Sequence, residues 1–519
     1  MFGRVLTATI LAATMGLATA QEPPARELWP PSKLDFGRPV EVARFPVDYV
    51  CSVFPVTLEF VNDQIHLIYM TGRHGASPAL LYQKSLDGGR TWGKALVLDE
   101  ASMAQACRDG DTLWIAAVCG DTAGLQRYGT AVKIFKINLK TGRTEPGRTI
   151  LGSVESAPDE TLTLGMVGVA ARSAQLAVTI VEPPRRGAQP DPQETSFKLR
   201  LLVSTDTGAT WQERPLKDAV AIPNTSIACW PMLRADDVAL VLGTEDLALA
   251  EVDRRGLAQM KPLMLPDAIG KSADPLRVAA DGKTFFMALA QRERADLARF
   301  FMTTSPDGIQ WGRPIALTEP MPYGLITPFT HIAASGPNVL FGYTATTGEW
   351  LSGQTSAQAL ISRDAGRTFE RIGLDSKFRH GSLMPVMALS PDGTRIGCVA
   401  VALGPNANER MDNNTPRGNF VGEAYLVFMC SPPLPPAPGP ANAKRAPHIR
   451  ELVRQLGSAD YRQREQATAE LHNEGEQAVP FLEQALQDED LEIATRARML
   501  LREAYPTWLN PSPARPTAP

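Results

Sequence analysis

Short apolar stretches rich in β-branched residues alternate with polar turns along most of the chain. Seven of these stretches are each followed by a loop and by one or two further apolar stretches. Runs of this length and composition are typical of β-strands. The pattern therefore predicts seven similar all-β units, whose shared strands are QIHLIYM (64–70), TLWIAAV (112–118), QLAVTIV (175–181), VALVLG (238–243), TFFMALA (284–290), VLFGYTA (339–345) and RIGCVAV (395–401).

A short polar motif recurs in phase with these strands. Asp and Gly suit a tight turn, because the carboxylate can accept backbone N–H groups and Gly tolerates positive φ. The closing Trp or Phe supplies a large apolar anchor. We expect each copy to close a turn rather than to carry chemistry. The copies are SLDGGRTW (85–92), STDTGATW (204–211), SPDGIQW (305–311) and SRDAGRTF (362–369), with degenerate forms at 137–145 and 251–259.

A period of about fifty residues, carried by all-β units that Gly, Asp and Asn turns connect, is typical of a β-propeller. Six or seven blades fit the spacing of the motifs, and the seven repeated strands favour seven. We therefore expect an all-β propeller over residues 21–430.

The composition changes after Cys430. SPPLPPAPGPA at 431–441 predicts an extended, semi-rigid linker over 431–445. Apolar residues then recur at helical spacing, beginning with Ile449, Leu452 and Leu456. We expect a small all-α helical-repeat domain over 446–506 and a disordered tail over 507–519.

The N-terminus is typical of a secretory signal. Arg4 precedes an apolar run over 5–17, and Ala18-Thr19-Ala20 forms a small-x-small cleavage site. We expect residues 1–20 to be removed and the protein to be secreted or periplasmic. No later stretch reaches the roughly 18 apolar residues of a membrane span. The net charge of −4 shows no bias toward nucleic acid.

Export permits disulfide bonds, and the chain has six cysteines. Cys398 and Cys430 fall in neighbouring predicted strands of the last unit, so we expect them to form a disulfide, with buried free thiols as the alternative for all six. The cysteines and histidines show no metal-ligand spacing. We expect no metal and no cofactor.

The repeated S-x-D-x-G-x-T-W motif resembles the Asp box, or BNR repeat, of sialidase-like propellers, over about residues 45–430. Sialidases of this kind hold a sugar carboxylate with three arginines and use a tyrosine nucleophile and an acid/base aspartate. By resemblance, Arg73 and Arg292 stand at arginine positions, and Asp274 stands in a Glu-Pro-like element with Pro275. The last 65 or so residues before the tail resemble HEAT-like repeats, which usually bind partners.

The resemblance has three gaps. Val53 stands at the position of the first arginine, and Gly381 stands at the position of the tyrosine. The segment HGASPALLY after Arg73 offers no acid/base aspartate. Exo-glycosidase activity by the family mechanism is therefore left open.

Propellers of this kind bind ligands where the innermost strands begin and where loops leave the second strands. Arginines can grip an acidic sugar, carboxylates can move protons, and Trp can stack on a sugar face. Glu182 and Trp230 also fall near this end, although Trp230 follows Cys229 within a strand and is more typical of the core. We expect Arg73, His74, Arg292, Trp350, Arg379 and His380 to bind substrate, and Asp274, Glu245 and Glu349 to be the catalytic candidates.

Two functions follow from these candidates. The first is binding or hydrolysis of an extracellular glycan, with an acidic sugar favoured by the arginines. The alternative is a non-catalytic interaction protein, in which the propeller and the C-terminal helices recognise protein or polysaccharide. In that case the helices contact a protein partner.

Overall fold

The computed structural model divides the 519-residue chain into two compact units, residues 1–434 and 435–519. It describes residues 28–504 except 30, 33, 35, 48–52, 72–78, 121–128, 153–166, 183–197, 215–228, 235–236, 244–246, 254–255, 264, 266–272, 295–296, 323–329, 348–353, 375–381, 404–421, 435–445, 475–477, 479–480, 483–484, 487 and 489.

The described part of unit 1 consists of antiparallel β-strands in six hydrogen-bonded sheets. The longest path is β2 (Val53–Val61), β3 (Gln64–Thr71), β4 (Ala79–Ser85), β5 (Leu96–Asp109), β6 (Thr112–Cys119), β7 (Ala131–Asn138) and β8 (Arg143–Gly152). Two sheets follow it, β9 (Val167–Arg172), β10 (Gln175–Glu182), β11 (Lys198–Ser204) and β12 (Gln212–Arg214), then β13 (Cys229–Leu233), β14 (Val238–Gly243), β15 (Leu247–Asp253) and β16 (Gly256–Pro262).

The remaining sheets complete the unit. One contains β17 (Ala273–Ala280), β18 (Phe285–Arg294), β19 (Leu297–Ser305), β20 (Ile315–Ala316) and β21 (Met321–Pro322). The next contains β22 (His331–Ser335), β23 (Asn338–Thr347), β24 (Gln354–Ser362) and β25 (Glu370–Ile372). The last joins β26 (Ser382–Leu389), β27 (Ile396–Leu403) and β28 (Gly422–Cys430) to β1 (Val40–Val47).

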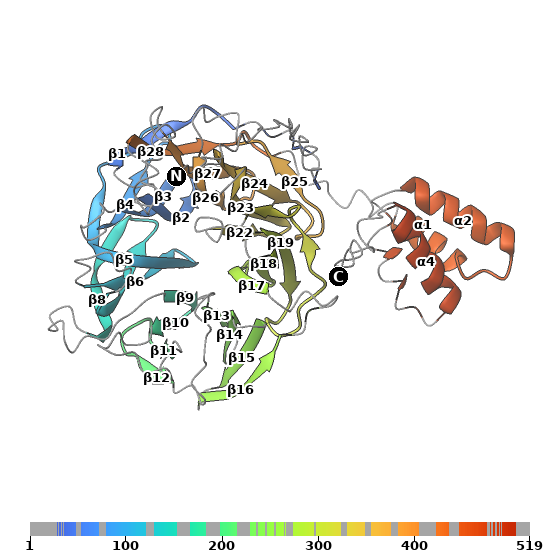
Figure 1. Cartoon of the computed structure of the whole chain (residues 1–519), viewed down its shortest axis with the longest axis horizontal. Coiled ribbons are helices and arrows are strands. Elements are labelled where there is room, and N and C mark those ends of the chain that lie inside the picture. The colour runs from blue at the N-terminus through green and yellow to red at the C-terminus, as the bar shows by residue number, and fades with distance from the viewer. Residues whose placement is uncertain are drawn as a thin grey trace, which may run out of the picture. The chain divides into compact units, whose positions relative to one another are not determined.

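The sheets stand around a ring, with the first strand of each nearest the centre, as in a β-propeller (Figure 1). The long path turns at β5, whose first half pairs with β4 and whose second half, from Ala101, pairs with β6. β5 is therefore the outer strand of one group of strands and the inner strand of the next. All seven stretches that the sequence pattern marked as shared strands are strands, and each lies second in its group, as β3, β6, β10, β14, β18, β23 and β27.

Prolines mark several of the innermost strands. Pro55, Pro275 and Pro385 each lie where the register with the second strand shifts. An innermost strand has a neighbour on one side only, and a bulge removes a further ladder bond, so proline is tolerated there. These bends shape the wall of the ring centre.

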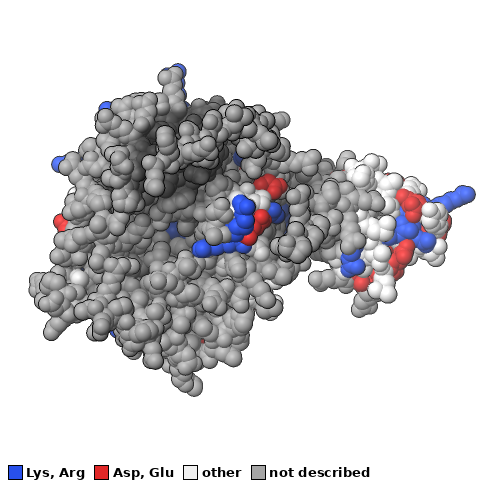
Figure 2. All heavy atoms as spheres, in the orientation of Figure 1, with Lys and Arg blue, Asp and Glu red and all other residues white. Residues whose placement is uncertain are grey.

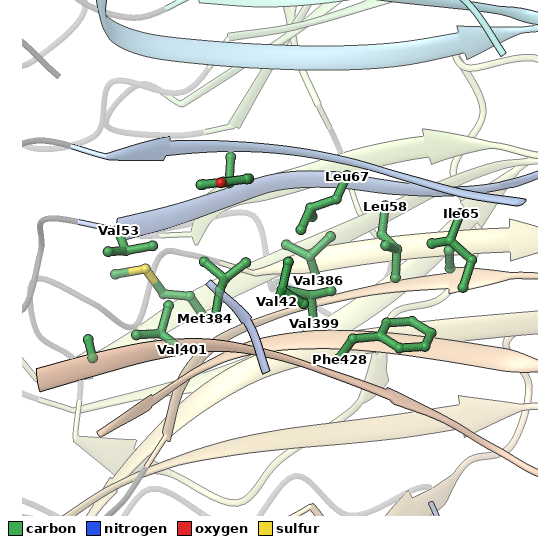
Figure 3. Packing of buried hydrophobic residues seen from close by; sticks show 14 of the residues in the cluster. Val42, Val53, Leu58, Ile65, Leu67, Met384, Val386, Val399, Val401 and Phe428 are labelled. Carbon is green, nitrogen blue, oxygen red and sulfur yellow. The ribbon is translucent and has the colours of Figure 1, made fainter. Parts of the chain in front are cut away.

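The core of unit 1 lies between sheets. Figure 3 shows one cluster, in which Val53, Leu58 and Leu67 of the first sheet face Val401 and Phe428 of the last. The described residues form seven such clusters around the ring. Each cluster combines residues of two neighbouring groups of strands: Leu58 and Val401 share one, as do Leu80 and Leu113, Trp114 and Val178, Leu201 and Leu240, Val241 and Leu289, Phe286 and Phe341, and Leu340 and Met387.

The repeated motif closes the turn between the third and fourth strands. In the first copy, Ser85 Oγ donates to Asp87 Oδ1 at 2.8 Å and accepts from the Gly89 N–H at 2.9 Å. Asp87 also accepts from the N–H of Thr91 at 2.9 Å. The same serine–aspartate–glycine bonds recur in the copies that begin at Ser204, Ser305 and Ser362. The degenerate copies lie at the corresponding β7–β8 and β15–β16 turns.

The aromatic residue of each full copy anchors its turn on the preceding sheet. Trp92 packs edge-on against Phe428 of β28, with ring centroids 5.5 Å apart. Trp211, Trp311 and Phe369 join the clusters that their own sheets share with the sheet before. The motif therefore fixes both a turn and a contact between sheets.

A segment from Trp29 to β1 closes the ring. The indole of Trp29 donates to the Ala316 carbonyl at 3.2 Å, and the N–H of Ser32 donates to the Arg371 carbonyl at 2.7 Å. The N–H of Gly37 then reaches the Cys430 carbonyl, and β1 pairs antiparallel with β28. This closing segment crosses the last three sheets and supplies the outer strand of the final one.

The expected disulfide is wrong. Cys398 and Cys430 are both free thiols. Cys430 lies opposite Gly397 in the β27–β28 ladder, so the two cysteines are one residue out of register and their side chains face different core clusters. Successive side chains on a strand point to opposite faces, which separates the sulfurs.

Unit 2 contains helices α1 (Ala446–Gln455), α2 (Tyr461–Glu474) and α4 (Leu491–Ala504). Ile449, Leu471 and Leu500 lie in a core of their own. Basic and acidic side chains are interspersed on the described helix surface (Figure 2), including an Arg496–Glu465 ion pair of 2.9 Å. Within the described residues, no helix combines the length and apolarity that crossing a membrane requires.

Candidate functional site

Most of the expected site residues lie outside the described residues. These are Arg73, His74, Glu245, Glu349, Trp350, Arg379 and His380. Each described strand that adjoins one of these residues in sequence does so at the same end of its sheet. β3, β14 and β23 are second strands that end just before these positions, whereas β26 is an innermost strand that begins just after two of them.

Asp274 and Arg292 lie on described strands of one sheet. Asp274, near the start of β17, pairs with Ala290 of β18. Arg292 follows two residues later on β18, opposite Ala298 of β19, and its side chain is half-buried. Both residues lie at the end of the sheet opposite the 305–311 turn. The structure therefore brings these two backbone positions together on adjacent strands.

Two acidic side chains described near this end lie in ion pairs. Glu182 lies 3.5 Å from Arg200, which also lies 3.2 Å from Glu213. Glu293 lies 3.3 Å from Arg299. Opposite charges at these distances offset one another, so Glu182 is explained by a structural role.

Val53, at the family's first arginine position, is 1% exposed in the cluster between the first and last sheets. Ser382, next to the tyrosine position, accepts the N–H of Ala357 at 2.9 Å. Both side chains serve the packing of the ring. The described residues thus give Val53 and Ser382 structural roles.

A second group of polar residues lies on the innermost strands at the ring centre. Arg277 Nη1 donates to Gln105 Oε1 at 2.6 Å, which joins β17 to β5 across the ring. The Arg277 guanidinium carbon lies 4.9 Å from the centre of the Trp230 ring. The indole N–H of Trp230 donates to the Pro275 carbonyl at 3.3 Å. Trp230 is half-buried, so the expectation that it is a core residue is wrong.

Glu59 and Arg108 lie on the neighbouring inner strands β2 and β5. Arg108 Nη1 lies 3.4 Å from Glu59 Oε2 and donates to the Phe60 carbonyl at 2.9 Å. Burial raises the pKa of Glu59, while the charge of Arg108 opposes the rise. The pair therefore holds one carboxylate and one guanidinium together beside the ring centre.

The titratable groups around Arg277 are held neutral. Burial, helped by the charge of Arg277, lowers the pKa of His331 to about 3. Burial also raises the pKa of the Cys107 thiol, and nearby carboxylates add to the rise. Burial lowers the pKa of Arg277 itself to about 10, which still leaves it charged at neutral pH. Arg277 is therefore charged at neutral pH, whereas His331 and Cys107 beside it are neutral.

The sequence reasoning missed this central group because it searched strand ends. Gln105, Cys107, Arg277 and His331 stand inside strands or at their first residue, where a polar side chain usually faces solvent on one side of a sheet. The sequence did contain a usable signal. Arg277 comes two residues after Pro275, and a proline of this kind marks an innermost strand. A charged side chain on an innermost propeller strand does not reach the solvent outside the ring. It must therefore point to the ring centre or to a neighbouring sheet.

No group of three or more His, Cys, Asp or Glu residues that could hold a metal ion occurs in the part of the chain that the structure describes. The cysteines described there are free, and burial raises the pKa of Cys119, Cys229 and Cys398 to about 12. These thiols are inert packing residues at neutral pH.

No protein-family model matches the chain, and no curated protein matches it in sequence. Solved structures similar to it include the endosialidase of phage phi92, at 10% identity and a TM-score of 0.41 over 78% of this chain and 70% of the other. An arabinanase of Penicillium chrysogenum, solved with arabinobiose, has 10% identity and a TM-score of 0.39 over 76% and 98%. A protein of unknown function from Dyadobacter fermentans has 13% identity and a TM-score of 0.40 over the same shares.

Proposed function

We propose that the chain is an exported, sialidase-like propeller of seven blades that binds or hydrolyses an acidic extracellular glycan. The ligand contacts the end of the sheets where innermost strands begin and second strands end. One observation carries the proposal: Asp274 and Arg292 lie on adjacent strands at that end of one sheet, away from the motif turn. The other candidates stand next in sequence to the same ends of other sheets.

The blade count rests on β5 and on the core. If β5 is divided at Ala101, where its partner changes from β4 to β6, the strands form seven groups. The seven apolar clusters then lie one between each pair of neighbouring blades. Six blades have a third–fourth turn made by one stretch of chain, and four full and two degenerate Asp boxes occupy those turns. The seventh takes its outer strand from β1, so it has no box.

An arginine such as Arg292 suits a carboxylated or sulfated sugar, because its planar guanidinium can make two parallel hydrogen bonds to an oxyanion. Hydrolysis would need a proton donor and a second carboxylate on the other side of the bond. Asp274, with Glu245 or Glu349, is the candidate pair for that chemistry. Arg73, His74, Trp350, Arg379 and His380 are the candidates for holding the rest of the sugar.

Fluorogenic glycosides test the proposal directly. The wild-type chain is incubated with α-sialosides, β-glucuronides and matched neutral glycosides, and binding of acidic oligosaccharides is titrated in parallel. Turnover of an acidic substrate that Asp274→Asn abolishes supports hydrolysis. Binding without turnover supports recognition alone. Absence of both binding and turnover across the acidic panel rejects the proposal.

A non-catalytic interaction protein is the second candidate. The burial of Val53 at a family arginine position favours it, because that side chain now stabilises the ring. In this function the HEAT-like helices of unit 2 dock on a protein partner, and the propeller recognises protein or polysaccharide. Co-purification of a partner by the full chain, lost when unit 2 is deleted while the propeller stays folded, supports this function.

Export is tested separately. We propose that cleavage after Ala20 releases a mature chain that begins at Gln21. The closing segment from Trp29 onward would remain intact after this cleavage. Mass spectrometry of the protein recovered from the periplasm or medium measures the N-terminus, and a cytoplasmic, uncleaved chain contradicts export.

A further inference from the structure

Arg277 spans the centre of the ring. It lies in the middle of β17, and its Nη1 reaches Gln105 on β5 at 2.6 Å although 172 residues separate the two. β5 and β17 belong to sheets that are not neighbours around the ring (Figure 1). A bond between them therefore crosses the centre rather than following the wall.

The guanidinium of Arg277 keeps donors available. Arginine has five N–H groups. The contacts found for Arg277 are the bond to Gln105 and the face of Trp230, and within the described residues no carboxylate forms an ion pair with it. Its side chain is only half-buried, and none of its nitrogens is both sealed from solvent and unbonded. Its remaining donors therefore point to space that a solvent molecule can enter.

Among the residues that the structure describes, no nearby charge compensates this cation. Glu59 already faces Arg108 at 3.4 Å. His331 is neutral because its pKa is about 3, and Cys107 is a protonated thiol because burial raises its pKa. A half-buried cation with neutral neighbours attracts an anion more strongly than a fully exposed one, because less water screens it.

We infer that Arg277 forms an oxyanion-binding site at the ring centre, with Gln105 fixing the guanidinium and Trp230 supporting its face. The site takes a carboxylate, sulfate or phosphate group, either as a free ion or on an acidic sugar. It is separate from the strand-end site of Arg292 and does not depend on glycan recognition there. The aromatic support and the cross-ring bond both hold the guanidinium plane in one orientation, as bidentate recognition requires.

Inorganic sulfate, D-glucuronate and D-glucose are the probes for this site, titrated by calorimetry and by the fluorescence of the full chain. Wild type should bind sulfate or glucuronate but not glucose. Arg277→Gln should weaken anion binding about 10- to 100-fold, the usual loss for a charged hydrogen bond, and Arg277→Lys should recover part of it. Trp230→Phe should remove the fluorescence change while calorimetry still detects binding.

Arg367→Gln is the control, because it removes an exposed arginine in a motif turn that belongs to neither site. Sulfate binding should be unchanged in this variant. Arg292→Gln separates the central site from the strand-end site. Loss of anion binding in Arg292→Gln with retention in Arg277→Gln overturns the inference and leaves the proposed function standing. Absence of anion binding by wild type also overturns it. Binding of sulfate alone identifies a free-ion site, whereas binding of glucuronate as well identifies an acidic-sugar site.

Thermal unfolding is a second test, and it does not depend on a direct titration of binding. Sulfate stabilises proteins non-specifically by exclusion from their surface, so wild type and Arg277→Gln are compared at equal sulfate. A specific site adds a saturable rise in Tm to wild type alone. Equal rises in the two proteins contradict the inference. Far-ultraviolet circular dichroism confirms that Arg277→Gln remains folded before the comparison is made.

Discussion

Gly89 lies directly against the ring of Phe428, although the two residues belong to the first and last sheets of the propeller. Gly89 has a φ of +88°, and a Cβ placed on it would overlap the Phe428 ring. Trp92, three residues later, packs on the same ring. This contact joins a motif turn to the strand that receives the closing segment.

Gly89→Ala should therefore destabilise the propeller by more than about 3 kcal/mol, because it adds backbone strain to a steric overlap in a packed core. Gly88→Ala is the matched control. Gly88 also has positive φ, at +71°, but nothing lies within 4 Å of the position that an added Cβ would take. That change should cost about 1–2 kcal/mol. Urea unfolding measures both, and equal losses would refute the packing role of Gly89.

The buried serine of the motif should matter more than its exposed neighbour. Ser85 is 1% exposed and accepts the Gly89 N–H at 2.9 Å. Ser85→Ala leaves that buried N–H without its acceptor and should cost about 1–3 kcal/mol. Leu86, 63% exposed in the same turn, should tolerate alanine within about 0.5 kcal/mol. Denaturation midpoints of the two variants test the difference, and a neutral Ser85→Ala would contradict it.

Acid should weaken the propeller through His66. His66 is buried, its Nδ1 lies 2.7 Å from the Tyr82 hydroxyl, and burial lowers its pKa from 6.5 to about 4, with Lys84 and Arg108 adding to the shift. Between pH 6.5 and about 4 the unfolded state binds the proton and the folded state does not. Stability therefore falls as the pH falls through that window, by about 3 kcal/mol in all for a shift of this size.

His66→Gln should flatten the pH dependence of stability by as much as about 1.4 kcal/mol per pH unit within this window. His331, whose pKa is about 3, contributes a similar dependence that remains in the variant. Urea unfolding at several pH values measures the slopes. Parallel curves for wild type and His66→Gln would contradict the prediction.

Arg292→Ala should weaken the binding of an acidic oligosaccharide by about 1.5–3 kcal/mol, roughly ten- to a hundredfold, if the strand-end site holds its acidic group. Arg292→Lys should restore part of the affinity, because it keeps the charge and loses the planar fork. Titration calorimetry with wild type and both variants gives the comparison. Equal affinities would remove Arg292 from the site and favour the interaction-protein function.

The sequence predicted the repeating units well, because a strand pattern marks every unit and a turn motif independently marks most of them. All seven shared strands lie where the pattern placed them. The sequence could not reveal the contact between Arg277 and Gln105, because it depends on which strands face one another across a closed ring. The Cys398–Cys430 prediction failed for a related reason. Neighbouring strands were inferred correctly, but a shift of one residue in register reverses the face of a side chain.

The pairing of β1 with β28 also sets an order of events during synthesis. Val40 emerges early from the ribosome, whereas its partner Phe428 emerges after nearly the whole propeller has been made. The first-made strand must therefore wait unpaired, and an unpaired strand can join other chains. If export is coupled to synthesis, the ring closes only after translocation of residue 430, so β1 stays without its ladder partner for nearly the whole of that time.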